Sequence, residues 1–166
     1  MTDAFAIRRL DPADIEAAHV INQACVPAVG SLTAETLAAY LAQAISAPAA
    51  YDGDTLAGFL ICLGEGANYD SLNYDWVSAR FDTFAYVDRI AFDAAYRNRG
   101  LGDKLYRAAL AEIPVRHEQL ICEVNLAPPN PGSQRFHDRL GFKPIGERWT
   151  EDRAKGVVYL ARPLAG

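Results

Sequence analysis

Residues 86–105 read Tyr86-Val87-Asp88-Arg89-Ile90-Ala91-Phe92-Asp93-Ala94-Ala95-Tyr96-Arg97-Asn98-Arg99-Gly100-Leu101-Gly102-Asp103-Lys104-Leu105. An apolar strand pattern ends at Phe92, and a loop with two glycines then opens an amphipathic helix. The N-terminus of a helix presents unpaired backbone N–H groups and the positive end of the helix dipole, so it attracts phosphate. Gly100 and Gly102 lack a Cβ atom, which lets a ligand approach the backbone closely. The stretch therefore predicts a strand, a phosphate-binding turn and a helix in succession.

Basic side chains gather around this turn although the chain as a whole is acidic. The sequence has 166 residues, with 16 Lys or Arg, 21 Asp or Glu and a net charge of −5. Residues 89–107 reverse this balance, with five basic side chains (Arg89, Arg97, Arg99, Lys104 and Arg107) against two acidic ones (Asp93 and Asp103). The local positive charge favours an anionic, phosphate-bearing ligand. The negative charge of the whole chain argues against a nucleic-acid partner.

Three common nucleotide-binding or hydrolase motifs are missing from the sequence. There is no Gly-x-x-x-x-Gly-Lys-Ser/Thr run of the Walker A type. Leu105 occupies the third glycine position of the dinucleotide-binding pattern Gly-x-Gly-x-x-Gly. The Gly-x-Ser-x-Gly elbow of serine hydrolases does not occur. The phosphate-bearing ligand is therefore expected to bind in another way.

Length and composition predict one globular domain over residues 1–166. Hydrophobic residues make up 51% and charged residues 22%, so a core can form without disulfides or a metal. Cys25, Cys62 and Cys122 are expected to be reduced and buried, and no histidine has a metal-ligand spacing with them. No apolar run reaches the roughly 20 residues that span a bilayer, and the first residues lack a signal-peptide pattern. We expect a soluble, cytoplasmic protein with no metal and no membrane partner.

Hydrophobic periodicity predicts the element order β-α-α-β-β-β-α-β-α-β-β, an α/β (α+β) fold. Its mixed central sheet has six to seven strands, flanked by about four helices. Gly64 to Asp82 is expected to be a long irregular loop, of the kind that often carries function. The expected strands are Ala4–Leu10, Ala49–Tyr51, Thr55–Leu63, Phe84–Phe92, Leu120–Asn125, Phe142–Glu147 and Val157–Leu160, and the expected helices begin after Asp11, at Thr33, at Gly100 and at Ser133.

Two further motifs place the turn in a recognisable context. Arg97, Gly100 and Gly102 fit the pattern Arg/Gln-x-x-Gly-x-Gly/Ala, which here follows a Val-x-x-Ile-Ala-Phe strand. Glu123-Val124 lies on the next expected strand, and Asn130-x6-His137-x3-Gly141-Phe142 comes after it. Together these features resemble the GNAT family of N-acetyltransferases, whose second signature is usually Asn-x-x-Ala-x-x-x-Tyr-x-x-x-Gly-Phe. The resemblance covers most of the chain from Ala49 to Leu160 and includes a bacterial subgroup with Pro-Pro-Asn-x-x-Ser before Phe-His.

The resemblance implies that acetyl-CoA is the co-substrate. The backbone of Ile90, Ala91 and Phe92 would pair with the pantetheine arm. Asn130 would contact the pantetheine or the adenine end from the opposite side. The amides of a six-residue turn would hold the pyrophosphate, with Arg97 beside them: Asn98, Arg99, Gly100, Leu101, Gly102 and Asp103. Alternatively, the two glycines only begin a helix.

Glu123 is the candidate base for an amine that attacks the thioester directly. The amine must be neutral to attack, and a carboxylate can take its proton directly or through a water. A lone carboxylate within Leu-Ile-Cys-Glu-Val is unfavourable unless it has a partner or faces a cleft. The alternative is a structural ion pair at a strand end, with Arg89 as a partner.

His137 stands where the family pattern usually has the tyrosine that protonates the departing thiolate. An imidazole can donate a proton near neutral pH, so His137 is the candidate acid. Alternatively, it hydrogen-bonds the coenzyme or packs under Phe136 and Phe142. The missing tyrosine also keeps open a different function, a module that binds or senses acyl-CoA without turnover; a protein that retains only the fold for interactions is a third alternative.

The acceptor is expected to be a small-molecule or peptide amine. Asp88, on the predicted pantetheine strand, is a candidate for acceptor binding or a third possible base, with a solvated or ion-paired carboxylate as the alternative. Tyr74 and Trp76 are candidates for an acceptor pocket or, alternatively, for a lid that packs on the core. Aspartates at 70, 75 and 82 favour an amine over an acidic acceptor. A homodimer is a further expectation, because dimers are common in the family.

Overall fold

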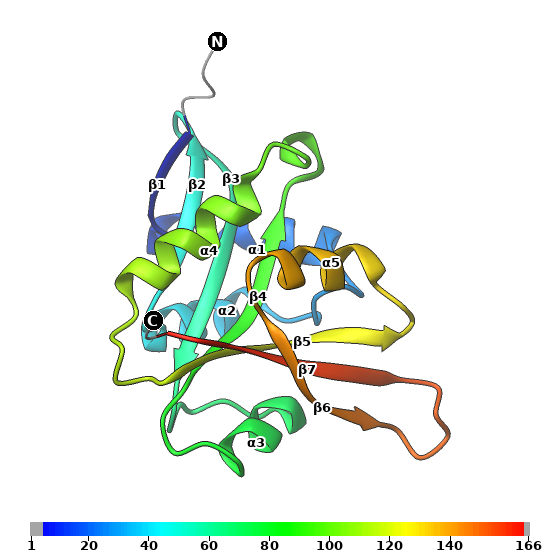
Figure 1. The fold of residues 1–166 in the computed structure, drawn as a ribbon. Helices are drawn as coiled ribbons and strands as arrows, with labels where there is room; N and C mark the ends of the chain where they lie inside the picture. The colour runs from blue at the N-terminus through cyan, green and yellow to red at the C-terminus, as the bar shows by residue number, and fades with distance from the viewer. Residues whose placement is uncertain (1–4, 165–166) are drawn as a thin grey trace.

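The computed structural model describes residues 5–164, which form one seven-stranded mixed sheet with five α-helices (Figure 1). The sheet order is β1-β2-β3-β4-β5-β7-β6, and β4 and β5 are its parallel pair. This confirms the predicted fold class. The strands are β1 (Phe5–Arg9), β2 (Pro48–Asp52), β3 (Thr55–Gly64), β4 (Ala85–Phe92), β5 (Gln119–Ala127), β6 (Lys143–Trp149) and β7 (Gly156–Pro163), and the helices are α1 (Ile15–Ala24), α2 (Ala34–Gln43), α3 (Leu72–Ser78), α4 (Leu101–Glu112) and α5 (Pro131–Arg139). Ala4, the first residue of the predicted strand, lies outside the described residues.

Local signals in the sequence fix several of these boundaries. The Thr33 side chain accepts a hydrogen bond from the Thr36 N–H and begins α2, as expected of an N-cap. Gly53 turns the hairpin between β2 and β3 with φ of +61°, and Gly141 ends α5 with φ of +89°. Both values lie in the left-handed region that favours glycine.

Helix α3 is the main difference from the predicted element order, because it lies within the stretch expected to be irregular. Ser71 caps it by accepting a hydrogen bond from the Tyr74 N–H. The helix has only seven residues, too few for a clear helical period, and its Asn and Asp residues favour turns as much as helices. Packing of Tyr74 and Val77 on the sheet stabilises it.

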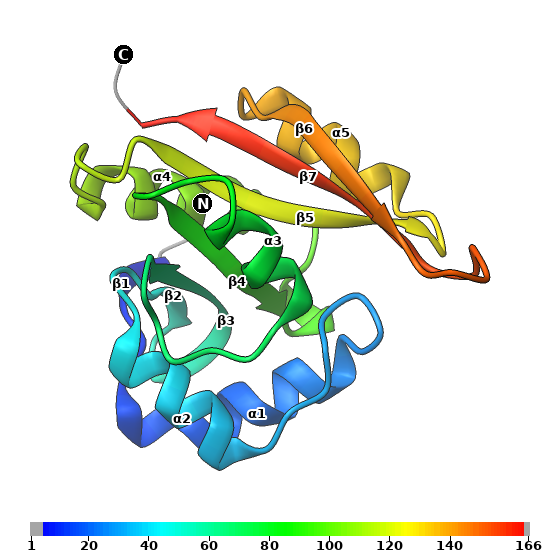
Figure 2. The same ribbon diagram turned by 90° about the horizontal axis from the view of Figure 1, so that it is seen from below.

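Helices cover both faces of the sheet (Figures 1 and 2). One face carries α4, whose buried Leu101, Leu105, Tyr106 and Ala109 form the largest apolar cluster with the strands, and α5 packs against the same cluster. The opposite face carries α1 and α2 over the first half of the sheet and α3 over β4, β5 and β7. No helix within residues 5–164 is long and apolar enough to cross a membrane.

Strands β4 and β5 part soon after they meet. Their parallel ladder consists of two pairs, Ala85 with Leu120 and Tyr86 with Ile121. A bulge in β4 follows at once, because consecutive residues of β3 pair with Val87 and Arg89 and leave Asp88 as the extra residue. The bulge shifts the alternation of the strand, so Val87 faces α4 whereas Ala91 faces α1 and α2.

We predict that Ser71→Ala lowers the free energy of unfolding by about 1 kcal/mol, the usual effect of losing an N-cap side chain. Urea denaturation checks this value. Ser71→Asp is the matched control, since aspartate also caps helices and should retain most of the stability. Equal losses in the two variants would contradict a capping role for Ser71.

Candidate active site

The parting of β4 and β5 opens a cavity of about 490 Å³ in the middle of the molecule. Its walls include residues 87–92 of β4 and residues 122–125 of β5, and the loop after α1 closes one side. Within residues 5–164 no strand pairs with this edge of β4 beyond Tyr86, so its backbone N–H and C=O groups can bind a ligand. The Phe92 carbonyl accepts weak contacts from Arg97 Nη2 at 3.4 Å and Cys25 Sγ at 3.5 Å. The cavity is lined by these residues predicted to bind the coenzyme: Ile90, Ala91, Phe92, Arg97, Asn130 and His137.

A second cavity, of about 700 Å³, lies at the N-terminus of α4. It shares Phe92 and Arg97 with the first, so the two form a continuous groove. Its walls include Asn98, Gly100, Leu101, Gly102 and Asp103 from the predicted pyrophosphate turn. The predicted pyrophosphate turn therefore lines the part of the groove at the N-terminus of α4, and the groove continues from there into the cavity between β4 and β5. Arg99 is the exception among these residues, because it lines neither of the two cavities and its guanidinium lies 5.4 Å from the centre of the Tyr96 ring.

The first turn of α4 has the features of an anion site. Its N-cap, Gly100, has φ of +72° and open space where a Cβ would be, and no side chain of the described chain caps the helix. The first N–H groups of α4 are therefore available to an anion. Gly102 has a second function, because a Cβ there would lie 3.0 Å from the Phe136 ring, which packs α5 onto α4.

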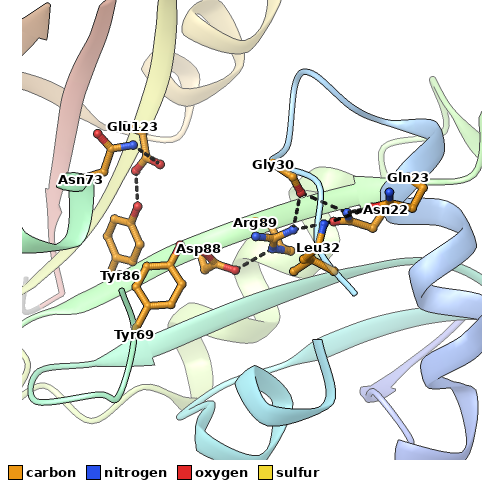
Figure 3. Close-up of polar contacts among 10 residues, drawn as sticks. All are labelled: Asn22, Gln23, Gly30, Leu32, Tyr69, Asn73, Tyr86, Asp88, Arg89 and Glu123. Carbon is orange, nitrogen blue, oxygen red and sulfur yellow. Dashed lines mark hydrogen bonds and ion pairs between the residues drawn. The ribbon is translucent and has the colours of Figure 1, made fainter. Parts of the chain in front are cut away.

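Glu123 lies at the other end of the groove, half-buried in the cavity wall (Figure 3). Its Oε2 accepts a hydrogen bond from the Tyr86 hydroxyl at 2.6 Å, and its Oε1 accepts one from the Asn73 Nδ2 at 3.2 Å. Burial raises the pKa of Glu123 to about 7, and the two hydrogen bonds and the charge of Asp88 modify this effect. A carboxylate with this pKa can exchange a proton near neutrality.

The alternative prediction of an ion pair between Glu123 and Arg89 is wrong, because Arg89 pairs with its neighbour Asp88 instead (Figure 3). The Arg89 Nε donates to Asp88 Oδ2 at 2.6 Å, and its Nη1 donates to the Asn22 side chain at 2.7 Å and to the Gly30 carbonyl at 2.9 Å. The Asp88 side chain is 1% exposed and also accepts a hydrogen bond from the Tyr69 hydroxyl. Asp88 is therefore ion-paired, and with Arg89 it ties the loop after α1 to β4.

His137 is buried, and both of its ring nitrogens are engaged within the protein. Nδ1 lies 2.7 Å from the Ser133 carbonyl oxygen, and Nε2 lies 2.7 Å from the Tyr106 hydroxyl. A carbonyl only accepts, so Nδ1 carries the proton and Nε2 accepts from Tyr106. Burial lowers the pKa of His137, which favours the neutral ring, and the ring packs edge-on against Phe136 and Phe142. The packing alternative is thus what the structure shows, and His137 has no free N–H for a departing thiolate.

Two predicted acceptor residues, Tyr74 and Trp76, pack on the sheet and do not line the cavity. The Tyr74 hydroxyl donates to the Gly64 carbonyl at 2.6 Å, within the core. The Trp76 ring stacks on Tyr159 with centroids 3.9 Å apart, and Gly146 leaves room for it. The same helix instead directs Asn73 to Glu123.

Four residues at the site were not predicted from the sequence: Cys25, Asn73, Tyr86 and Tyr106. Cys25 is only half-buried, contrary to expectation, and lies in the cavity wall, where Arg97 Nη2 is 3.4 Å from its sulfur. Tyr106 and Tyr86 fit an apolar helix stripe and an apolar strand, so the sequence signals only burial. Their hydroxyl partners become known only from the fold.

The sequence model of the Acetyltransferase (GNAT) family matches residues 19–142, most of the chain. The protein belongs to the GNAT acetyltransferase family. The GNAT fold is shared with the ribosomal-protein-S18-alanine N-acetyltransferase of Escherichia coli, with a TM-score of 0.74 and 22% identity over 98% of this chain and 95% of that chain. No curated protein sequence gives a significant match.

Two further solved structures share the GNAT fold. Ard1 from Thermoplasma volcanium has a TM-score of 0.77 and 18% identity, over 98% of this chain and 99% of that chain. The yncA protein of Salmonella typhimurium, solved with its cofactor acetyl-CoA, has a TM-score of 0.73 and 17% identity, over 98% of this chain and 95% of that chain. At these identities the likeness establishes the fold of the present GNAT protein and not its acceptor.

We predict that the Glu123 carboxyl group titrates with a midpoint near 7, well above the usual value of about 4.3. Carbon-13 NMR of the side-chain carboxyl groups measures this without any substrate, and Glu123→Gln assigns the resonance. Tyr86→Phe removes a hydrogen bond that stabilises the charged form, so it should move the midpoint to higher pH. A midpoint near 4 in the unmodified protein would contradict the assignment.

Proposed function

We propose that the protein transfers the acetyl group of acetyl-CoA to the primary amine of a small molecule or peptide. The observation that carries the proposal is one continuous groove, which leads from the uncapped N-terminus of α4 to a carboxyl group whose pKa is raised to about 7. Membership of the GNAT family supports acyl transfer. The yncA structure contains acetyl-CoA, and the Escherichia coli relative acts on an alanine of a ribosomal protein.

The groove offers complementary groups along the length of the coenzyme. The N–H groups at the start of α4, with Arg97 beside them, suit the pyrophosphate. The unpaired edge of β4 from Ile90 to Phe92 suits the amides of the pantetheine arm. Asn130 uses its Oδ1 to cap α5 through the Ser133 N–H, and its amide nitrogen makes no hydrogen bond within residues 5–164. That nitrogen is therefore free to donate to the coenzyme.

Glu123 acts as the base in this proposal. Bound acetyl-CoA supplies an acetyl group that is already activated as a thioester, so the chain needs no nucleophile of its own. Above pH 7 the Glu123 carboxylate takes a proton from the acceptor ammonium, directly or through a water, and leaves a neutral amine to attack. Tyr86 and Asn73 hold the two carboxylate oxygens in place during this transfer.

Tyr106 replaces His137 as the candidate donor to the departing sulfur. Both residues line the cavity, but the one N–H of neutral His137 is occupied by the Ser133 carbonyl. Burial raises the pKa of Tyr106, so its hydroxyl stays protonated. Its O–H is donated to His137 Nε2 in this structure, and it rotates from there toward the sulfur to donate to the developing thiolate. His137 then acts as a positioning residue, because its Nε2 accepts from this hydroxyl and keeps it at the cavity wall until the thiolate forms.

Release of CoA thiol, measured with acetyl-CoA and a panel of amines, tests the function. We predict that Glu123→Gln lowers kcat/KM by about 10²-fold or more, the usual range for a general base, while CoA binding persists. Glu147→Gln, at an exposed position on β6, is the matched control and should retain activity. CoA binding without thiol release for any amine would instead support an acyl-CoA sensor, which the absence of a free N–H on His137 favours.

We also predict that Tyr106→Phe lowers kcat by about tenfold or more with little change in KM, because a donor to the transition state is lost. The variant also leaves the buried His137 Nε2 without its partner, which should lower stability by about 1–3 kcal/mol. Tyr51→Phe is the control, since it removes a partly buried hydroxyl that bonds Asp14 far from the cavity. Full turnover by Tyr106→Phe would exclude the donor role.

A further inference from the structure

A third cavity adjoins the active site on the side of the β6–β7 hairpin. It has a volume of about 250 Å³ and lies between the loop after α1, the end of β5 and the hairpin. Pro27 and Asn125 line both this cavity and the one that contains Glu123, so the two are contiguous. A molecule that places its amine beside Glu123 can therefore extend into this hairpin cavity. The lining residues are Pro27, Asn125, Ala127, Pro128, Arg148, Thr150, Lys155, Gly156 and Val157.

The hairpin cavity is positively charged. Its two ionisable lining residues, Arg148 and Lys155, are both cations. Within residues 5–164 neither of them lies within 4.0 Å of a carboxylate. Asp152, in the same hairpin, uses its carboxylate to accept hydrogen bonds from Thr150 and Ala154, although the charge of Lys155 contributes to its lowered pKa. Arg148 is therefore the cation with the least compensation.

Arg148 is held in a fixed orientation with one side of its guanidinium unused. Its Nε donates to the Tyr159 hydroxyl at 3.1 Å, and its Nη2 donates to the Asn73 Oδ1 at 2.8 Å. Nη1 makes no hydrogen bond to any residue in the described part of the chain. It is also not buried, because no buried side-chain nitrogen or oxygen among these residues lacks a partner. An oriented guanidinium with free N–H groups at a cavity wall suits a carboxylate, which it can bind through two parallel hydrogen bonds.

A single amide group connects this guanidinium to the proposed base. Asn73 accepts from Arg148 with its Oδ1 and donates to Glu123 with its Nδ2. The site thus presents a proton acceptor for an amine and a cation for an anion, separated by one amide group and its two hydrogen bonds. The two ends of a free amino acid, an ammonium and a carboxylate joined through one carbon, match this pair in charge and in order.

We propose that the acceptor is a free amino acid, with its amine at Glu123 and its carboxylate at Arg148. This inference rests on the proposed acetyl transfer and narrows its substrate class. A peptide N-terminus or a simple amine offers no negative charge one carbon from the nitrogen and leaves Arg148 without a partner. Rigid binding at both ends also fixes the nitrogen for attack.

The experiment compares matched acceptors that differ only in the carboxylate: each common amino acid, its amide and the corresponding decarboxylated amine. Thiol release from acetyl-CoA gives kcat/KM for each. We predict a preference of about tenfold or more for the acid over the amide, as expected for a charge-assisted hydrogen-bonded pair. Equal use of acids and amides, or a preference for amides and peptides, would overturn the inference and leave acetyl transfer standing.

Arg148→Gln should bring the ratio of acid to amide close to one, mainly through KM for the acid. Arg148→Lys retains the positive charge but loses the two parallel N–H donors of the guanidinium, so it should give an intermediate acid-to-amide ratio. Lys143→Gln, exposed on the same strand, removes one positive charge away from the cavity and should retain the full ratio. A full ratio in Arg148→Gln would exclude the assignment. If that variant does not fold, the ratio of the unmodified protein and that of Arg148→Lys decide.

Calorimetry separates this inference from the function on which it rests. Amino acids and their amides are titrated into the CoA-bound protein, without any turnover. Tighter binding of the acids, lost in Arg148→Gln, supports the anion site even if no amine releases thiol, in which case only the proposed transfer fails. Equal binding of acids and amides overturns the anion site whatever the activity.

Discussion

The parting of β4 and β5 after two ladder pairs is the constraint on which the site depends. A parallel sheet that continued would satisfy every backbone group between these strands and would leave no room for a ligand. Because the strands separate, the edge of β4 keeps free hydrogen-bonding groups, and side chains of β5 such as Glu123 face an enclosed space. The bulge at Asp88 comes shortly after the last β4 residue that pairs with β5. It turns Asp88 and Arg89 toward the face of the sheet that carries α1.

Burial then sets the electrostatics of the two carboxylates beside this opening. Asp88 has an arginine and a tyrosine hydroxyl as partners, and its ion pair with Arg89 anchors the loop after α1. Within residues 5–164, the side chains that donate to Glu123 are neutral, Tyr86 and Asn73, so desolvation dominates and its pKa rises. Two acids on neighbouring strands thereby acquire different properties, and only the less compensated one is suited to move a proton.

The sequence was sufficient for those features that depend on local pattern. The succession of the seven strands along the chain and the start of α4 at Gly100 followed from periodicity and glycine positions. The cost of a buried carboxylate pointed to a cleft or a partner for Glu123, and the fold places Glu123 at the cavity. Helix α3 was not predicted, because its seven residues are too few to show a clear helical periodicity of apolar residues. Local sequence alone was also insufficient for Tyr106 and His137, since the tautomer of the ring depends on a hydroxyl from another helix and a carbonyl in its own.

Helix α3 joins the two halves of the sheet beneath their point of separation. Its Tyr74 bonds the end of β3, while its Trp76 stacks on Tyr159 of β7 over the space left by Gly146. This short helix therefore acts as a spacer that sets how widely the wedge between β4 and β5 opens. Bulkier or smaller side chains at this contact would change the separation of β4 and β5 without altering any residue that lines the cavity.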